Sequence, residues 1–137
     1  MNSIAKDYIY CYHINENIKY CIFMSRSKKM IEFRNVNKTY DTGTEAVHNA
    51  NFKIEKGEFA FLVGSSGSGK STLIKLILKE EEPTSGNIII NGKDTTFLKA
   101  RRVPYLRRSM GVVFQDFRLL PDKTVYENVA FAMYIVK

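Results

Sequence analysis

The chain has 137 residues, 45% of them hydrophobic, and this composition allows one domain with a packed core and excludes a disordered polypeptide. Its formal net charge of +7 fits an anionic ligand or a membrane-proximal partner and does not by itself indicate nucleic acid. The two cysteines, Cys11 and Cys21, lack metal-ligand spacing, so neither a metal site nor a disulfide framework is expected. No apolar run approaches the length of a membrane-spanning helix.

Residues 1–29 form a segment of different composition, rich in Tyr, Ile and Asn, whose apolar residues follow neither a helical nor a strand period. No element is predicted there, and we expect a weakly structured leader, with a specific docking segment as the alternative. A third interpretation is that the leader is not native coding sequence, because Met30 opens a well-patterned segment and would serve as a start.

The next segment predicts two half-buried strands followed by a fully buried one. Residues 31–34 and 49–54 alternate apolar with polar side chains, and a turn is expected between them at 39–44. A tight reversal at 55–58 leads into the apolar run 59–63, whose lack of alternation is typical of a strand buried on both faces. We therefore expect an antiparallel edge that meets a parallel core strand.

The stretch GSSGSGKST, residues 64–72, has the glycine and lysine spacing of a phosphate-binding loop between a strand and a helix. Its glycines allow backbone N–H groups to approach an anion, and the start of the helix adds its positive dipole end. Lys70 is expected to bridge the β- and γ-phosphates, and the Ser71 hydroxyl to hold Mg²⁺. A flexible linker is the alternative, although a linker does not separate two strongly apolar elements. The predicted nucleotide ligands in the loop are Gly64, Ser65, Ser66, Gly67, Ser68, Gly69, Lys70, Ser71 and Thr72.

The helix that follows the loop is predicted to carry an apolar stripe from residues 73–77 and to end at 80–83. A turn at 84–86, a short strand at 88–90 and a tight turn at 91–92 are expected next. This order continues the sheet after the helix.

Two short helices are predicted beyond that turn, one capped by Thr95 or Thr96 and a second over residues 104–110, where a proline favours the first helical turn. The run 111–115 indicates another buried strand. Its polar end, Gln115, would face the ligand, as the carboxyl ends of strands do in open α/β sheets.

A capping box starts the last predicted helix, because Thr124 and Glu127 can each satisfy a free backbone N–H at a helix start. The apolar face of this helix is formed by Val125, Val129, Ala132 or Met133, and Val136.

The chain resembles the nucleotide-binding subunit of ABC transporters, and within that family its cell-division branch, in three stretches that span nearly all of residues 30–134: MIEFRNVNKTY, KGEFAFLVGSSGSGKSTLIKLILKEEEPTSGNIIINGKD and VPYLRRSMGVVFQDFRLLPDKTVYENVAFAM. The resemblance implies the N-terminal portion of an α/β P-loop NTPase fold of the ABC type. In this fold an antiparallel β edge meets the start of a parallel core sheet with helices. Residues 30–137 would then be an incomplete ABC ATP-binding domain.

The resemblance assigns roles to three residues outside the loop. Tyr40 would stack on adenine, which an aromatic ring supports through dispersion, and Val47 would pack near the ribose. Gln115 is similar to the glutamine of the Q-loop, which contacts Mg²⁺ or its water. The implied cofactors are ATP and Mg²⁺, with Ser71 and Gln115 as metal ligands. The alternatives are an ordinary loop tyrosine, a core valine and a surface glutamine.

By the same resemblance, the whole protein would form a homodimer, bind an integral membrane subunit and lie in the cytoplasm at the inner face of the cell membrane. No nucleic acid partner is expected, because no aromatic stacking pattern accompanies the basic residues. The chain has one basic group, which forms either a solvated face or a contact for an acidic loop of the membrane partner or anionic lipid. Its members are Arg101, Arg102, Arg107 and Arg108.

Three motifs that the family needs for hydrolysis do not occur in the 137 residues: the Leu-Ser-Gly-Gly-Gln signature, an apolar strand ending in Asp-Glu, and a switch histidine after the loop. No catalytic residue is therefore predicted, and we expect the front part of a longer domain, with a non-catalytic nucleotide-binding module as the alternative. A GTPase would need an Asn-Lys-x-Asp motif that the chain lacks, and a small-molecule kinase has no use for Tyr40 or Gln115.

Overall fold

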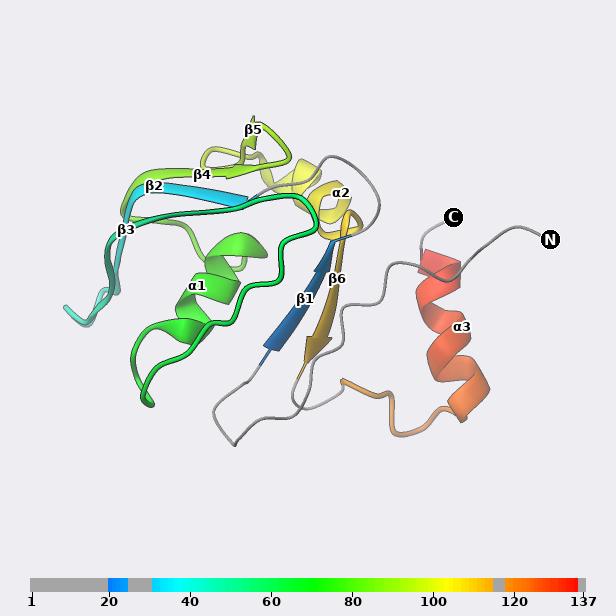
Figure 1. Ribbon diagram of the computed structural model, residues 1–137. Helices are drawn as coiled ribbons and strands as arrows, with labels where there is room; N and C mark the ends of the chain where they lie inside the picture. Colours follow the sequence, from blue (N-terminus) through cyan, green and yellow to red (C-terminus); the bar gives the residue numbers. More distant parts are fainter. Residues whose placement is uncertain (1–19, 25–30, 115–117, 136–137) are drawn as a thin grey trace.

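A computed structural model describes residues 20–24, 31–114 and 118–135 of the chain (Figure 1). Its strands form one sheet of four strands and one of two, and helix α1 covers one face of the larger sheet. In chain order the elements are β1 (Tyr20–Met24), β2 (Ile31–Thr39), β3 (Glu45–Ile54), α1 (Lys70–Ile77), β4 (Ser85–Ile90), β5 (Lys93–Asp94), the 3₁₀ turn η1 (Ala100–Arg102), α2 (Val103–Arg107), β6 (Met110–Phe114) and α3 (Val125–Ile135).

The four-stranded sheet is antiparallel throughout and has the strand order β3-β2-β4-β5. Strand β2 is central, so Ile31 is aligned with Ile54 of β3 on one side and with Ile90 of β4 on the other. The turn at Asn91 and Gly92, with φ values of 57° and 72°, joins β4 to β5 as a tight hairpin. The three strands predicted for this part of the chain are confirmed, and so is the tight turn.

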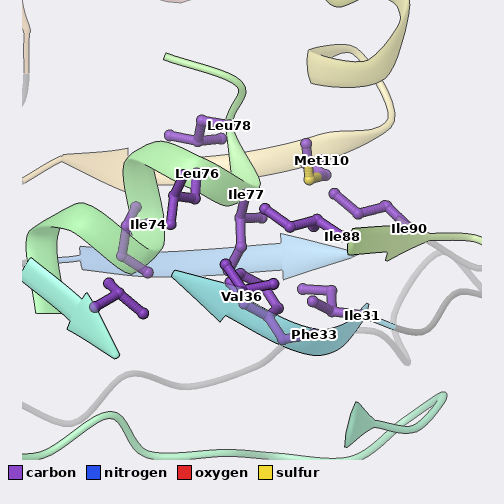
Figure 2. Packing of buried hydrophobic residues seen from close by; sticks show 11 residues of the cluster. Ile31, Phe33, Val36, Ile74, Leu76, Ile77, Leu78, Ile88, Ile90 and Met110 are labelled. Atoms are coloured by element: carbon purple, nitrogen blue, oxygen red, sulfur yellow. The ribbon is translucent and has the colours of Figure 1, made fainter. Parts of the chain in front are cut away.

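The core lies between this sheet and helix α1 (Figure 2). Phe33 of β2 and Ile88 of β4 are each only 2% exposed, and the Phe33 ring stacks on Phe52 with 4.5 Å between centroids. Leu76 and Ile77 supply the apolar stripe of α1 and complete the cluster. Burial of each such side chain stabilises the fold by about 1.5 to 3 kcal/mol, which fixes α1 against the sheet.

A bulge in β2 changes which of its residues face the core. Asn35 has a φ of 49°, and the pairing with β3 shifts register between Phe33 and Val36. Before the bulge the buried residues are odd-numbered, Ile31 and Phe33, whereas after it Val36 is buried and the Lys38 side chain is only 14% exposed. The end of β2 therefore turns its even-numbered residues toward the side of the sheet that α1 covers.

Residues 59–63 do not form the buried strand that their composition predicts. The segment lies outside every strand, and Phe61 and Val63 are 59% and 76% exposed. A strand buried on both faces needs neighbouring strands and covering helices, and every strand pairing among the described residues is antiparallel and involves other segments. The antiparallel part of the expected sheet is present, whereas the described residues contain no parallel core.

Strand β1 is an element that the sequence analysis missed. Residues Tyr20–Met24 pair antiparallel with Met110–Phe114 along their whole length. Such pairing uses backbone N–H and C=O groups and needs no side-chain period, so the lack of a period in residues 1–29 hid it. The strand expected at 111–115 is present over 111–114 as part of β6 (Met110–Phe114), but Gly111 is exposed and Val112 half-buried, so its expected burial is not confirmed.

Helix α1 ends at Ile77, earlier than the predicted end at 80–83. Lys79 adopts a left-handed φ of 55°, and the Glu80 N–H bonds back to the Lys75 carbonyl at 2.8 Å. This arrangement satisfies a free carbonyl at the helix end, and it turns the chain toward β4.

The prediction of a helix capped by Thr95 or Thr96 is wrong. Both threonines are buried, and the Ile88 N–H donates to Thr96 Oγ1 at 2.9 Å while Thr95 Oγ1 donates to the Ile88 carbonyl at 3.0 Å. Their hydroxyls therefore bond to the sheet instead of capping a helix. The first helical turn comes later, at Ala100–Arg102, and Pro104 lies in the first turn of α2 as predicted.

Helix α3 starts at the predicted capping box. The Thr124 N–H donates to Glu127 Oε2 at 2.8 Å, and the Glu127 N–H donates to Thr124 Oγ1 at 3.2 Å. The bond from the Thr124 N–H is the main reason why the pKa of Glu127 lies below its ordinary value. The predicted apolar face is exposed, as Val125, Val129 and Met133 show.

We expect Thr124→Ala to destabilise the start of α3 by about 1 kcal/mol, because a backbone N–H loses its acceptor. Amide hydrogen exchange of the first turn of α3 measures this, and exchange should become about fivefold faster, the rate factor that corresponds to 1 kcal/mol. Thr124→Ser keeps the hydroxyl oxygen and serves as the control. Equal exchange rates in the Ala variant and the wild type would show that the capping box contributes nothing.

Candidate functional site

The glycine-rich loop 64–72 leads directly into helix α1 (Figure 1). Gly69 is the N-cap residue of α1, with a φ of 84°, and no side chain caps the helix. The N–H groups at this end lack a capping acceptor, and the helix dipole adds partial positive charge there. A helix start of this kind is suited to bind an anion such as phosphate.

Gly69 is required by its surroundings as well as by its φ. A Cβ at this position would overlap the Ala46 carbonyl oxygen of β3, so loop and strand approach each other at backbone distance. Gly67 has a similar φ of 80°, but a Cβ there would meet nothing within 4 Å. Gly69 thus anchors the loop to the sheet, while Gly67 and Ser66 form its exposed turn.

The Lys70 ammonium lies inside the loop. Its Nζ donates to the Gly64 carbonyl at 2.7 Å, to the Ser65 carbonyl at 2.5 Å and to Ser68 Oγ at 3.2 Å, and the Ser68 N–H donates to the Ser65 carbonyl at 3.2 Å. The structure therefore gathers the predicted loop residues around one cation beside a helix start. A phosphate entering the loop would exchange these neutral acceptors for charged ones, which form stronger hydrogen bonds.

The loop and Tyr40 are connected through Thr72. Tyr40 follows β2 immediately, and its hydroxyl lies 3.3 Å from Thr72 Oγ1 in the first turn of α1. Ser71, the residue predicted to hold Mg²⁺, is half-buried in the same turn. Two predicted ligand groups, the aromatic ring and the loop, are thus brought together although the sequence separates them by more than twenty residues.

The structure describes the predicted ligand Val47 but not the predicted ligand Gln115. Val47 is 8% exposed and belongs to the core cluster, close to the place where Gly69 meets β3. Its proximity to a ribose remains a prediction. Gln115 lies outside the described residues, directly after the end of β6, so its role and the proposed metal pair with Ser71 also remain predictions.

Lys38 is a residue of this site that was not predicted; its Nζ lies 5.0 Å from the centroid of the Tyr40 ring and 2.9 Å from Glu81 Oε2. The spacing Lys-x-Tyr could have suggested a shared strand face. Without the bulge at Asn35, however, the alternation of β2 places both residues on the face opposite to Phe33.

The basic group is partly structural. Arg107 donates from Nε to the Leu78 carbonyl at 2.8 Å and from a terminal nitrogen to the Lys79 carbonyl at 3.1 Å, and so caps the end of α1. Arg107 is nevertheless exposed, like Arg101, Arg102 and Arg108, so the interpretation of the group as a solvated face stands beside this structural role. Arg108 lies 5.5 Å from the centroid of the Tyr105 ring, and the contact of this group with a membrane partner stays a prediction.

A shallow hollow on the outer face of the sheet is a competing site, lined in part by Glu32, Arg34, Asn87 and Asp94. Its charges are satisfied internally, because Arg34 Nε donates to Glu32 at 2.7 Å and Asn87 donates to Asp94 at 2.9 Å. The side chain of Thr96, and then its backbone N–H, lower the pKa of Asp94, so this carboxylate stays charged. Two carboxylates disfavour phosphate here.

A family profile of ABC transporters matches residues 47–136, so the chain belongs to the ABC transporter family. It is 51% identical over 107 residues to the cell division ATP-binding protein FtsE of Bacillus subtilis and 51% identical over 106 residues to FtsE of Escherichia coli. These matches cover 78% and 77% of this chain but only 47% and 48% of the two relatives. The chain therefore spans about half the length of the curated relatives it matches.

Solved structures agree with this assignment. The ATP-binding cassette MJ0796, in a dimeric post-hydrolysis state bound to ADP and Pi, superposes with a TM-score of 0.69 at 35% identity, over 78% of this chain and 48% of the cassette. The cbiO1 protein of Clostridium perfringens, part of the ABC transporter complex cbiONQ, gives a TM-score of 0.70 at 29% identity, over 81% and 44%. The fold is that of part of an ABC ATPase cassette. Among the described helices, none combines the length and apolar character needed to cross a bilayer.

Proposed function

We propose that the protein binds Mg·ATP through the loop 64–72 as the ATP-binding subunit of an ABC complex that acts in bacterial cell division. The observation that carries this proposal is the Lys70 ammonium held among the loop carbonyls at the uncapped start of α1. The name shared by relatives at about 50% identity, cell division ATP-binding protein, supports the cellular role.

The remaining ligands follow the same proposal. Tyr40 stacks on adenine, Val47 lies near the ribose, and Ser71 and Gln115 hold Mg²⁺. In the whole protein two copies form a homodimer, as the MJ0796 cassette does in its bound state, and an integral membrane subunit of the FtsX type holds the dimer at the inner face of the cell membrane. Hydrolysis belongs to this whole assembly, because the signature, the Asp-Glu strand and the switch histidine do not occur in the 137 residues.

Two alternatives share the loop and differ in the partner. One is an ATP-binding subunit of another ABC transporter, for import or export, and the other is a non-catalytic nucleotide-binding module. Co-purification with an integral membrane subunit would distinguish the cell-division proposal from a non-catalytic nucleotide-binding module. A cell-division phenotype on depletion of the protein would distinguish it from a subunit of another ABC transporter.

Tyr40→Ala is expected to weaken Mg·ATP binding by about 1 to 3 kcal/mol, the effect of removing an aromatic platform from beneath a base. Isothermal titration calorimetry with Mg·ATP measures the change, and Tyr105→Ala, which removes an exposed tyrosine ring far along the chain, is the control. An unchanged Kd in Tyr40→Ala would return this residue to an ordinary loop aromatic.

A further inference from the structure

Tyr40 forms hydrogen bonds both through its backbone and through its side-chain hydroxyl. Its backbone N–H donates to the Thr44 carbonyl at 2.9 Å, and its carbonyl accepts from the Gly43 N–H at 2.8 Å, so the turn after β2 fixes where the side chain starts. The hydroxyl at the far end lies 3.3 Å from Thr72 Oγ1, and Thr72 is buried in the first turn of α1. These hydrogen bonds fix the position of the Tyr40 ring relative to the loop 64–72.

One face of this ring is covered by a cation. The Lys38 ammonium lies over the ring, 5.0 Å from its centroid, within the range of an attractive cation–π contact. Glu81 Oε2 lies 2.9 Å from the same ammonium, and the Lys38 and Glu81 side chains are only 14% and 27% exposed. Lys38 is therefore a restrained residue and not a freely solvated surface lysine.

The bulge in β2 makes this arrangement possible. Because Asn35 shifts the alternation of the strand, Lys38 and Tyr40, two residues apart, follow Val36 onto the side of the sheet that α1 covers. Glu81 comes from the segment after α1, so the ammonium joins the end of β2 to the chain beyond the helix.

We propose that Lys38 is a positioning residue for nucleotide binding, which orients the Tyr40 ring so that the face opposite the ammonium receives the base. The inference rests on the proposed function, because it concerns how the same site takes the base of its nucleotide. Because the ammonium lies over one face of the ring, a base would stack on the opposite face. A ring ordered in advance loses less side-chain freedom on binding. The benefit is confined to ligands that carry a base.

The test compares Mg·ATP with Mg·tripolyphosphate, which has the phosphates but no base, by calorimetric titration of the full chain. Lys38→Met keeps the length of the side chain and removes the ammonium, and it should raise the Kd for Mg·ATP about 3- to 10-fold, the factor expected for one side chain that must be ordered on binding. The Kd for Mg·tripolyphosphate should change less than about twofold, since this ligand has no base to stack on the ring.

Two further variants separate positioning from charge and from stability. Lys38→Arg keeps a cation over the ring and should retain most of the affinity for Mg·ATP. Lys53→Met removes a lysine of β3 that is also ion-paired, to Glu55 at 2.6 Å, but lies at the other end of the β2–β3 ladder, and it should change neither Kd. Thermal unfolding midpoints of all variants show whether each remains folded.

Equal weakening of both ligands by Lys38→Met would overturn the inference and assign Lys38 to general electrostatic attraction. An unchanged Kd for Mg·ATP would overturn it as well, provided that the wild type binds. If the wild type binds neither ligand, the proposed function fails and the inference fails with it. If the wild type binds both and Lys38→Met behaves as the wild type, only the inference fails.

Discussion

Replacement of Lys70 by Ala is expected to weaken Mg·ATP binding by at least about 100-fold. The ammonium is the one cation that the structure places among the described residues of the loop, where it bonds to two carbonyls and a hydroxyl. Its two charge-assisted contacts with the β- and γ-phosphates would each contribute about 1.5 to 3 kcal/mol, which sums to a loss of more than two powers of ten in Kd.

The measurement is calorimetric titration or equilibrium dialysis with labelled Mg·ATP. Lys75→Ala is the matched control, because this substitution removes the same charge from the last turn of the same helix, away from the loop. Equal Kd values for the wild type and Lys70→Ala would contradict the assignment of the loop as the nucleotide site.

The second large effect is expected from Gly69→Ala, which should destabilise the protein by about 2 to 5 kcal/mol. An alanine at this position must adopt a left-handed φ, which costs roughly 1 to 2 kcal/mol. Its Cβ would also overlap the Ala46 carbonyl oxygen. Relief of such an overlap in a packed region costs about 1 to 3 kcal/mol more. Because the loop must move away from β3, Mg·ATP binding should be lost too.

Gly67→Ala is the control for this prediction, since it has nearly the same φ but open space around the added carbon. It should lose only the conformational part, about 1 to 2 kcal/mol. Urea unfolding of both variants gives the comparison. If the two substitutions destabilise equally, the close approach of the loop to β3 contributes nothing to the fold.

The antiparallel sheet and the loop were predictable from sequence because local signals suffice for them. Alternation predicted the strand around Ile31 and Phe33, the glycine spacing predicted a loop that leads into a helix, and Thr124 with Glu127 predicted a helix start. Each of these features depends on residues that are neighbours in the chain, so the physical cause is present in the sequence itself.

The features that failed depend on distant partners. The apolar run 59–63 predicts a buried strand only if neighbouring strands and helices cover it, and the described residues place none on it. Thr95 and Thr96 were predicted to cap a helix, but the Ile88 backbone competes for their hydroxyls. The strand at Tyr20–Met24 carries no side-chain period and is defined by its pairing with β6.

The residues proposed for the candidate site could be named from the sequence, whereas the contacts that position them could not. Lys70 and Tyr40 could be named from the sequence, whereas the role of Lys38 depends on a backbone bulge that inverts the alternation of β2. The asparagine at position 35 does not by itself predict a bulge, because Asn also occurs in ordinary turns and at the ends of strands. The residues that orient the ring are therefore visible only in the structure.

The most direct test of where the ligand binds is a titration of the ¹⁵N-labelled chain with Mg·ATP, followed by amide chemical shifts. We predict saturable shifts in residues 64–72 and at Tyr40, with no change around the outer hollow at Glu32 and Asp94. Shifts centred on the hollow, or no saturable shift in residues 64–72, would contradict the conclusion that this loop holds the nucleotide.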